Sequence, residues 1–408
     1  MSRAGSEAAF FVGVWGKAAF SLHATPGQLA GLMFVLSITS IAGSLLAGAL
    51  IDRWGPRRVL ITFEVLFIPA ALAIAAAQTL PQLAAIVGVW AFVGAPVVTA
   101  GASFAPFLAT QDEGDLKRVN AWIEGAGSMS FVVGPAAGAL LVRYATVDWV
   151  FILDAATSLA AALFVARVHV AMPERPEPAH GVSTHPFAEF AAGVRTAYTT
   201  RSLRFYVLAG SLVWMAFGAF GALEPLFFRD VVGTSVETLG WMNSFFGLGF
   251  LTGAMLLPRL PRRVVSATGL AITVMLTGMG TVLYVGSTDL RIIAVGAFLW
   301  ASVIGVMEPL LRTLLHRDTP RVVLGRVMGT AEVHRRVGEL LPLAFAPALA
   351  TAFGVQPVLI GGGLLATLMA VLAFPEARNI DRSLGKVGAT EEELQSLRMA
   401  DEPISPND

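Results

Sequence analysis

The sequence predicts an all-α membrane protein with twelve transmembrane helices arranged as two six-helix repeats. Two observations predict this fold class: the composition is too apolar for a soluble domain, and short motifs recur in the same order in both halves. Apolar residues make up 55% of the chain and charged residues only 14%, with a mean hydropathy of +0.70. A soluble protein of this length needs more charge to cover its surface.

The apolar residues gather in runs near the length that crosses a bilayer, which is about 20 residues in a helix. Because lipid offers no partner to backbone polar groups, such runs form helices. The expected spans are 5–22, 29–51, 59–78, 82–106, 120–143, 149–168, 203–228, 239–257, 264–285, 291–315, 329–352 and 358–375. The first span is short and contains Lys17, so we expect a helix that is either half-length or truncated at its start.

Two patterns recur between the halves. Gly-Ala followed by Pro-Arg-Arg occurs at 48–58 and again at 253–263, and Arg-Val followed by Glu occurs at 118–124 and again at 326–332. Both pairs fall at equivalent helix ends, which indicates parallel repeats related by an axis along the membrane normal. Such a protein holds its substrate between the halves near the middle of the membrane.

The repeat divides the chain into four expected units. They are a six-helix bundle over 1–168, a linker over 169–202 with an amphipathic helix, a second bundle over 203–375, and a charged, disordered tail over 376–408. Lys and Arg concentrate in the loops on the linker side, whereas the opposite loops hold only Arg143, Arg229 and Arg291. The positive-inside rule therefore predicts that the linker and both termini are cytoplasmic, in the inner (plasma) membrane.

The composition also excludes several classes of function. The formal net charge is zero, so the chain lacks the basic surface of a nucleic-acid-binding protein. Cysteine is absent, which excludes disulfides, thiolate metal sites and cysteine nucleophiles. No metalloprotease or serine-hydrolase motif is present, so we expect no enzyme activity, no catalytic residues and no metal site.

The loop after the second span carries the strongest motif, Gly-Ala-Leu-Ile-Asp-Arg-Trp-Gly-Pro-Arg-Arg at 48–58. It resembles the signature of the major facilitator superfamily, with Pro56 in place of one basic residue. The matching residues are Gly48, Asp52, Arg53, Gly55, Arg57 and Arg58. Gly48 allows close helix approach, and the resemblance implies that this gating motif latches the cytoplasmic side to the eleventh helix when the protein is open outward. Asp52 has no counterpart in the second copy, where Leu257 stands.

The fifth span contains a second motif, Gly134-Pro135-Ala136-Ala137-Gly138-Ala139. It is similar to the antiporter motif of proton-driven exporters in the same superfamily, and its simpler interpretation is helix packing through small residues. Together with the stretches at 118–121, 151–156 and 325–329, it makes the chain resemble the third drug:proton antiporter family, whose members export macrolides and siderophores. That resemblance also favours a truncated first helix.

Charged residues inside spans are the candidate functional residues, because each costs about 2.5–3.5 kcal/mol at a helix centre on insertion scales. Glu332, Arg335, Arg336 and Glu339 follow helical spacing and form one stripe that must face protein or water. The first three fit a cytoplasmic gate as well as a substrate site, and Glu339 lies deeper, toward the cavity. Glu64 and Asp154, on outer helices, are expected to be structural.

Two acids precede prolines, whose missing N–H loosens a helix: Glu224 in the seventh span and Glu308 in the tenth. A buried carboxylate there can exchange a proton for a cation, which makes both candidates for proton coupling. Arg312, one turn from Glu308, weakens that role, and Glu224 could instead lie near the outer surface. His334 is a further candidate for proton coupling, because histidine is the side chain that most often carries protons in proteins, or it serves as a partner for nearby carboxylates.

The resemblance implies a secondary active transporter that exports a small amphiphilic drug or natural product in exchange for protons. The expected partners are a small-molecule substrate, protons and lipid, in a monomer without a cofactor. Two alternatives remain open: an uptake symporter or facilitator for a metabolite, and a non-transporting membrane receptor with the same fold. The sequence does not identify the substrate.

Overall fold

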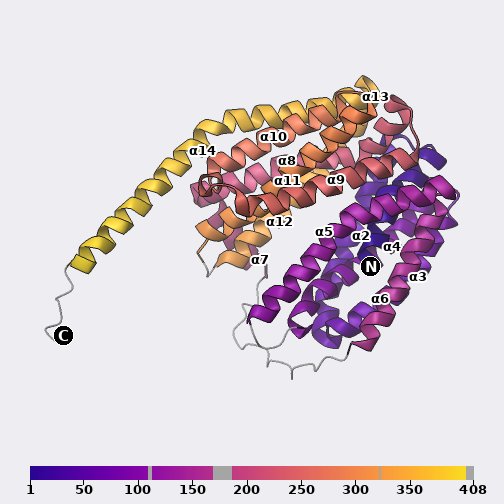
Figure 1. Cartoon of the computed structure of the whole chain (residues 1–408), viewed down its shortest axis with the longest axis horizontal. Helices are drawn as coiled ribbons and strands as arrows, with labels where there is room; N and C mark the ends of the chain where they lie inside the picture. The colour runs from indigo at the N-terminus through magenta and orange to yellow at the C-terminus, as the bar shows by residue number, and fades with distance from the viewer. Residues whose placement is uncertain (109–112, 169–185, 321–322, 401–408) are drawn as a thin grey trace.

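The computed structural model describes residues 1–108, 113–168, 186–320 and 323–400, and every regular element in these ranges is a helix. The helices form two bundles that lie side by side, one from each half of the sequence (Figure 1). Eleven of the described helical segments are long and apolar enough to cross a membrane. These features confirm the predicted fold class.

The first bundle begins with a twelfth, irregular segment that runs from Ser2 to Ser21 as α1 and two π-helical stretches. The elements of this bundle are α1 (Ser2–Ala8), η1 (Ala9–Val14), η2 (Gly16–Ser21), α2 (Pro26–Trp54), α3 (Pro56–Ala75), α4 (Leu80–Leu108), α5 (Glu113–Tyr144) and α6 (Asp148–Arg167). Prolines open α2 and α3, where the missing N–H costs nothing.

The second bundle follows the linker helix α7 (Pro186–Thr199). Its elements are α8 (Arg201–Leu226), η3 (Phe227–Val232), α9 (Val236–Leu256), η4 (Leu257–Arg259), η5 (Arg262–Val264), α10 (Ala267–Val285), α11 (Leu290–Asp318), α12 (Leu324–Leu340), η7 (Leu341–Ala344), α13 (Ala346–Phe353) and α14 (Val355–Ala400). The eleventh span is therefore two helices joined by the short turn η7. The expected disordered tail is instead helical as far as Ala400, because α14 continues through Pro375 and projects from the bundle (Figure 1).

The two ends of the molecule differ in how the bundles meet. We call the end that carries α7 the linker end and the opposite end, where α13 meets α14, the far end. At the far end one apolar core crosses both bundles and includes Leu29, Met33, Phe220 and Leu223. At the linker end each bundle has its own core, around Phe63 in the first and around the second bundle's α8, α10 and α11. The halves are thus joined at the far end and separate at the linker end.

Lys17 lies in the irregular first segment and is only 5% exposed. Its ammonium group donates to Asp148 at 2.8 Å and to the carbonyl of Ala75. Both partners belong to the far-end turns of α3 and α6. This lysine therefore fastens the first segment to its own bundle and does not line a pathway.

Two acids on outer helices are buried inside the first bundle. Asp154 is 0% exposed and accepts hydrogen bonds from Ser6 and Trp90, each at 3.0 Å. Glu64 is 2% exposed and accepts one from Ser2 at 3.0 Å. These bonds tie α1 to α3, α4 and α6, as expected for structural acids.

Gly278 provides a test of the packing between α10 and α14. A Cβ on this residue would lie 2.5 Å from the carbonyl oxygen of Gly363, so Gly278→Ala must push the helices apart. We expect a loss of about 1–3 kcal/mol of stability, the usual cost of overpacking, measured as a lower Tm in detergent. Gly31→Ala is the matched control, because a Cβ there meets no atom within 4 Å. Equal Tm values for the two variants would contradict the close approach.

Candidate functional site

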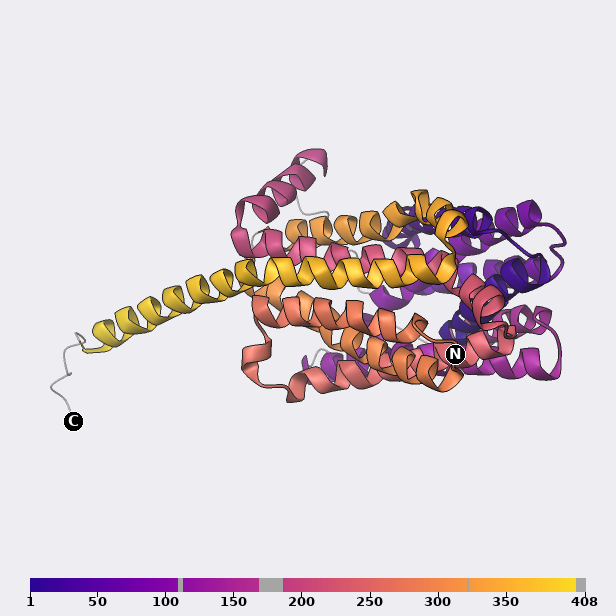
Figure 2. The ribbon, with the colours of Figure 1, turned by 90° about the horizontal axis from the view of Figure 1, so that it is seen from above.

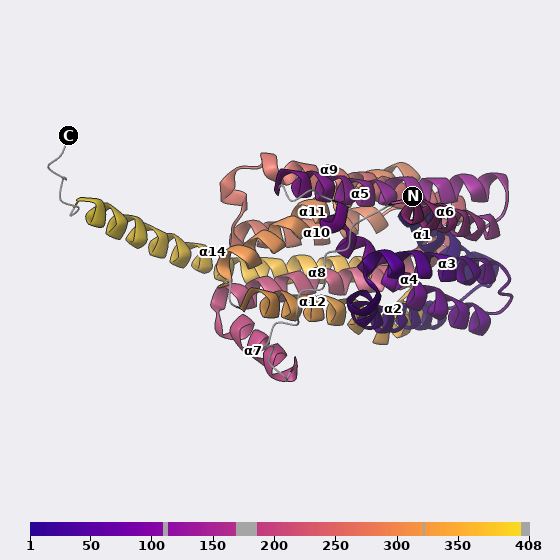
Figure 3. The ribbon, with the colours of Figure 1, turned by 90° about the horizontal axis from the view of Figure 1, so that it is seen from below.

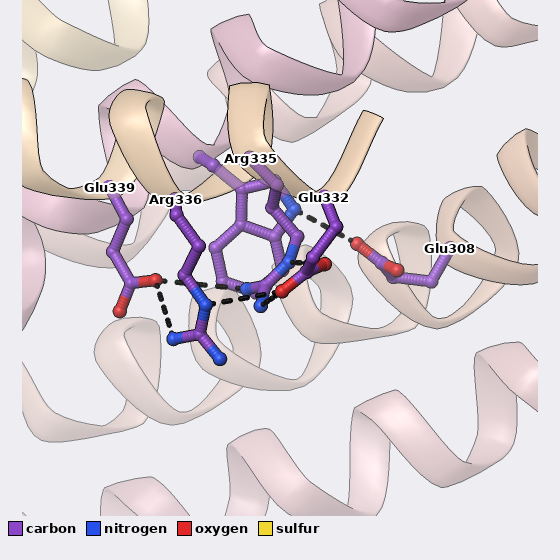
Figure 4. Close-up of polar contacts among 6 residues, drawn as sticks. Glu308, Glu332, Arg335, Arg336 and Glu339 are labelled. Carbon is purple, nitrogen blue, oxygen red and sulfur yellow. Dashed lines mark hydrogen bonds and ion pairs between the residues drawn. The ribbon is translucent and has the colours of Figure 1, made fainter. Parts of the chain in front are cut away.

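A group of charged residues lies on two neighbouring helices of the second bundle, and we call it the charged cluster (Figure 4). It consists of Glu308 on α11 and Glu332, Arg335, Arg336 and Glu339 on α12, and Trp214 of α8 contacts two of them. The four α12 residues are spaced so that they share one face of the helix, as the sequence predicts. Gly338 lets α12 lie close to α8, since a Cβ there would lie 2.7 Å from the carbonyl oxygen of Ser211 on α8.

The ion pairs within the cluster are short and shared. The Arg335 guanidinium donates to both oxygens of Glu332, at 2.7 and 2.5 Å, and Arg336 donates to the same carboxylate at 3.1 Å. On the other side, Glu339 lies 3.7 Å from Arg335 and 3.5 Å from Arg336. Each arginine therefore contacts one carboxylate toward the linker end and one deeper in the membrane.

Trp214 connects the stripe on α12 to α11. The Arg335 guanidinium lies over the indole ring, 4.6 Å from its centroid, which is a cation–π distance. The indole N–H donates to the carboxylate of Glu308 at 3.1 Å. Glu308 thus joins the cluster through Trp214, whereas Arg312 is exposed and makes no ion pair with Glu308 in the described ranges.

Exposure changes with depth along the stripe. The side chain of Glu332 is 52% exposed and that of Arg336 is 40% exposed, whereas Glu339 is 13% exposed. Counted in full charges, the cluster has three carboxylates and two guanidiniums. It therefore offers a compound arriving from the linker end an aromatic ring and groups of both charge signs.

His334 lies on the same helix but points away from the cluster. Its Nε2 lies 2.6 Å from the hydroxyl of Tyr198 on α7, and its Nδ1 lies 2.8 Å from the carbonyl oxygen of Thr330. The hypothesis that His334 serves a nearby carboxylate is therefore wrong for this structure. The histidine attaches the linker helix to α12, where Gly193 also packs against Arg326.

Glu224 is half-buried and lies in a different environment from Glu308. It accepts a hydrogen bond from Tyr284 within the far-end core, where the Phe220 and Trp300 rings are 4.7 Å apart. No arginine or lysine pairs with it among the described residues. The indole N–H of Trp300 is buried there without a hydrogen-bond partner in the same ranges. The structure does not bring the two coupling candidates together.

The gating motif covers the end of α2 and the start of α3, and in this structure its Arg57 is bonded to α6. Gly55 adopts φ 79°, a value that suits glycine, and turns the chain so that Arg57 donates to the carbonyls of Val165 and Ala166 at the end of α6. Arg53 and Arg58 are exposed. Asp52 is also exposed and makes no hydrogen bond or ion pair within the described ranges. A Cβ on Gly48 would meet no atom within 4 Å, so the expected close helix approach is absent in this conformation.

The antiporter motif lies where the two bundles meet, and Figure 3 shows α5 beside α9. Gly134 and Gly138 pack against the first segment, since Cβ atoms there would lie 2.6 Å from the oxygen of Ala4 and 2.9 Å from Val12. On its other side, Pro135 lies near Gly240 of α9. The motif is therefore a three-way packing contact that includes both halves.

Arginines complete the far-end contact between the halves, and the sequence reasoning missed this role. Arg229 of η3 donates to the carbonyl oxygens of Ala19 and Ala24, at 2.6 and 3.1 Å. Arg143 of α5 lies 3.5 Å from Glu237 of α9. The signal was present in the sequence, because these are two of the three arginines on the side that otherwise lacks positive charge.

Two helical bundles that are joined at one end and separate at the other are the architecture of a membrane transporter built from two repeats. The family model "Major Facilitator Superfamily" matches residues 1–342. The chain belongs to this family, whose members are transporters and not enzymes.

Two of the similar proteins are exporters by name. The multidrug efflux pump Tap of Mycolicibacterium fortuitum is 25% identical over 85% of this chain and 88% of its own. The enterobactin exporter EntS of Shigella dysenteriae is 26% identical over 84% of this chain and 82% of its own. Among solved structures, the nucleoside transporter NupG has a TM-score of 0.69 at 12% identity, covering 92% of this chain and 96% of its own. An auto-inhibited peptide transporter of the POT family has a TM-score of 0.67 at 13% identity, over 92% and 95% of the two chains.

Arg229→Gln tests the far-end contact. Hydrogen bonds to a charged donor are worth about 1.5–3 kcal/mol each, so losing those to Ala19 and Ala24 should raise the ratio of molecules open at the far end to molecules closed there by about a hundredfold or more. Because the chain has no cysteine, spin labels at Gln78→Cys and Thr288→Cys can report the far-end distance without background.

Arg291→Gln is the matched control, since this third far-end arginine is exposed and outside the contact. A distance distribution unchanged in Arg229→Gln, or changed equally in Arg291→Gln, would show that Arg229 does not hold the halves together.

Proposed function

We propose that this protein exports a small amphiphilic compound, a drug or a natural product, in exchange for protons. It works as a monomer in the bacterial inner membrane, with the linker end and the C-terminus in the cytoplasm. The observation that carries the proposal is the charged cluster, which lies within the membrane-spanning helices and on the side where the halves are separate. A compound can therefore reach it from the cytoplasm while the far-end core closes the opposite route.

The composition of the cluster indicates the class of compound. Trp214 and its neighbour Phe217, with ring centroids 5.3 Å apart, offer apolar stacking surfaces. Arg336 and Glu332 offer partly exposed charges of opposite sign. A compound with an apolar body and a polar group satisfies both, whereas a simple ion or an alkane satisfies only one. The names of the similar proteins, a multidrug efflux pump and a siderophore exporter, support the same class and the outward direction.

Glu308 and Glu224 are the proposed proton carriers. Trp214 donates a hydrogen bond to Glu308 and stacks against the Arg335 guanidinium. A cationic or hydrogen-bonding compound that binds here can therefore compete with a proton for the Glu308 carboxylate. Glu224 has only neutral hydrogen-bond partners, and an ionised carboxylate in an apolar region needs water or a donor. Opening the far end would hydrate Glu224 and change whether it holds its proton, which couples the proton to the conformation.

Replacing these acids tests the coupling. In proteoliposomes that contain a fluorescent amphiphile, an imposed proton gradient should drive transport by the unmodified chain. Glu308→Gln and Glu224→Gln should abolish that component while preserving exchange of the amphiphile down its own gradient, because glutamine keeps the shape and loses the titratable proton. The same assay is run in parallel with cationic, zwitterionic and neutral fluorescent amphiphiles.

Glu376→Gln is the matched control for loss of a carboxylate, since Glu376 pairs with Arg201 near the linker end, outside the cluster. Full gradient-driven transport in both Glu308→Gln and Glu224→Gln would refute coupling by these residues. Net accumulation in cells would instead select an uptake symporter or facilitator, and binding without flux would select a receptor.

The gating motif supplies a second test. We propose that Asp52, free in this conformation, engages the eleventh span when the linker end closes. Asp52→Asn should then slow transport severalfold without lowering the Tm, because the contact it removes exists only in the other state. Arg57→Gln should lower the Tm as well, since Arg57 already holds the end of α6. Unchanged transport in Asp52→Asn would rule out the latch.

A further inference from the structure

A groove on the outside of the second bundle opens near the far end. α8, α13 and α14, with the turn η7, enclose about 380 Å³, within the range of about 300–1,000 Å³ seen for small-molecule sites. Leu212, Met215 and Ala219 of α8 form its floor. Figure 2 shows α8 lying between α14, in yellow, and the orange helices α12 and α13.

The sequence explains why this space is empty of protein. On one wall the eleventh span is interrupted: α12 ends at Leu340, η7 forms a tighter turn, and Pro342 and Pro347 cannot donate backbone hydrogen bonds. On the other wall, α14 presents Gly361 and Gly362, where a Cβ would meet no atom within 4 Å. Irregular backbone at membrane depth is tolerated only where it lines a cavity or is covered by protein.

The groove is apolar throughout and faces the bilayer. Every residue that lines it is Gly, Ala, Pro, Val, Leu, Met or Phe. Its rim includes Phe353, which is 68% exposed, and Leu365, which is 50% exposed. Leu365 continues a row of exposed leucines along α14 that includes Leu368 and Leu372. On a membrane-spanning helix such a row contacts acyl chains.

The groove is separate from the charged cluster. Trp214, which contacts the cluster, lies on a different face of α8 from the residues that line the groove. Between these two faces, Ser211 and Gly218 of α8 pack against α12. No polar side chain in the groove could hold a head group or a charged compound. The abundant apolar species in contact with its opening is the hydrocarbon of the membrane.

We propose that this groove binds one acyl chain of a bilayer phospholipid, from the leaflet at the far end. The chain fills the space left by the interruption and packs against η7 and α13. Because α13 also contacts α2 of the first half, a bound chain stabilises the arrangement of the interrupted helix that the structure shows. This inference requires only the membrane fold and stands whether or not the protein exports an amphiphile.

Photolabelling tests the proposal. The full chain is reconstituted in nanodiscs of phosphatidylcholine that includes a fraction with a diazirine near the end of one acyl chain, irradiated, and mapped by mass spectrometry. We expect labels concentrated on Met215, Phe345 and Leu349, above the level at exposed apolar residues elsewhere, such as Leu45 of α2.

Gly362→Leu adds a large side chain to a groove residue whose Cβ would meet no atom within 4 Å, so it should abolish the concentrated label and leave the protein folded. Gly31→Leu adds the same side chain to a glycine of α2 that is equally open, and should leave the label as it is. After exhaustive delipidation, the unmodified chain and Gly31→Leu should retain one more phospholipid than Gly362→Leu in native mass spectrometry.

Three results would overturn the proposal. The first is labelling that is uniform over the lipid-facing residues. The second is an undiminished groove label in a folded Gly362→Leu protein. The third is displacement of the label by a fluorescent amphiphile that leaves labelling of α2 unchanged, which would assign the groove to a transported compound.

Discussion

The structure depends on one constraint: a charged side chain within the hydrocarbon region must contact protein or water. Lys17 meets it through Asp148 and a carbonyl, and Asp154 through a serine and a tryptophan. The residues of the charged cluster meet it by pairing with one another, and Glu332 and Arg336 also remain partly exposed on the side where the halves separate. Charge is thus buried where it ties helices together and left partly accessible in the charged cluster, where we propose that the transported compound binds.

The two halves are in contact at the far end of the molecule and separate at the linker end. At the far end, glycines of α9 allow it to approach α5, and Arg229 reaches across to the first segment. At the linker end, Asp52 is exposed and each bundle keeps its own core. The second half contributes the cluster and Arg229, and the first contributes the gating motif, so the two halves carry different charged residues at their contacts.

Four of the candidate residues show how helix spacing and tertiary position combine. Glu332, Arg335 and Glu339 lie together because their spacing puts them on one face, which the sequence alone determines. Glu308 joins them only because Trp214, from a third helix, lies between Arg335 and Glu308. No local pattern in the sequence indicates that a tryptophan on α8 faces both α11 and α12.

The sequence by itself determined the membrane class, the number of spans, the repeat and the gating motif, because these follow from hydropathy and local spacing. It also marked Arg143 and Arg229 as exceptions to the charge bias, without showing what they bind. Tertiary structure decided that His334 turns to the linker helix, that Glu224 and Glu308 occupy separate environments, and that the eleventh span breaks beside an apolar groove. The physical reason is that these outcomes depend on which side chains from distant helices come within a few ångströms, and helical periodicity fixes a residue's face but not the neighbour it meets.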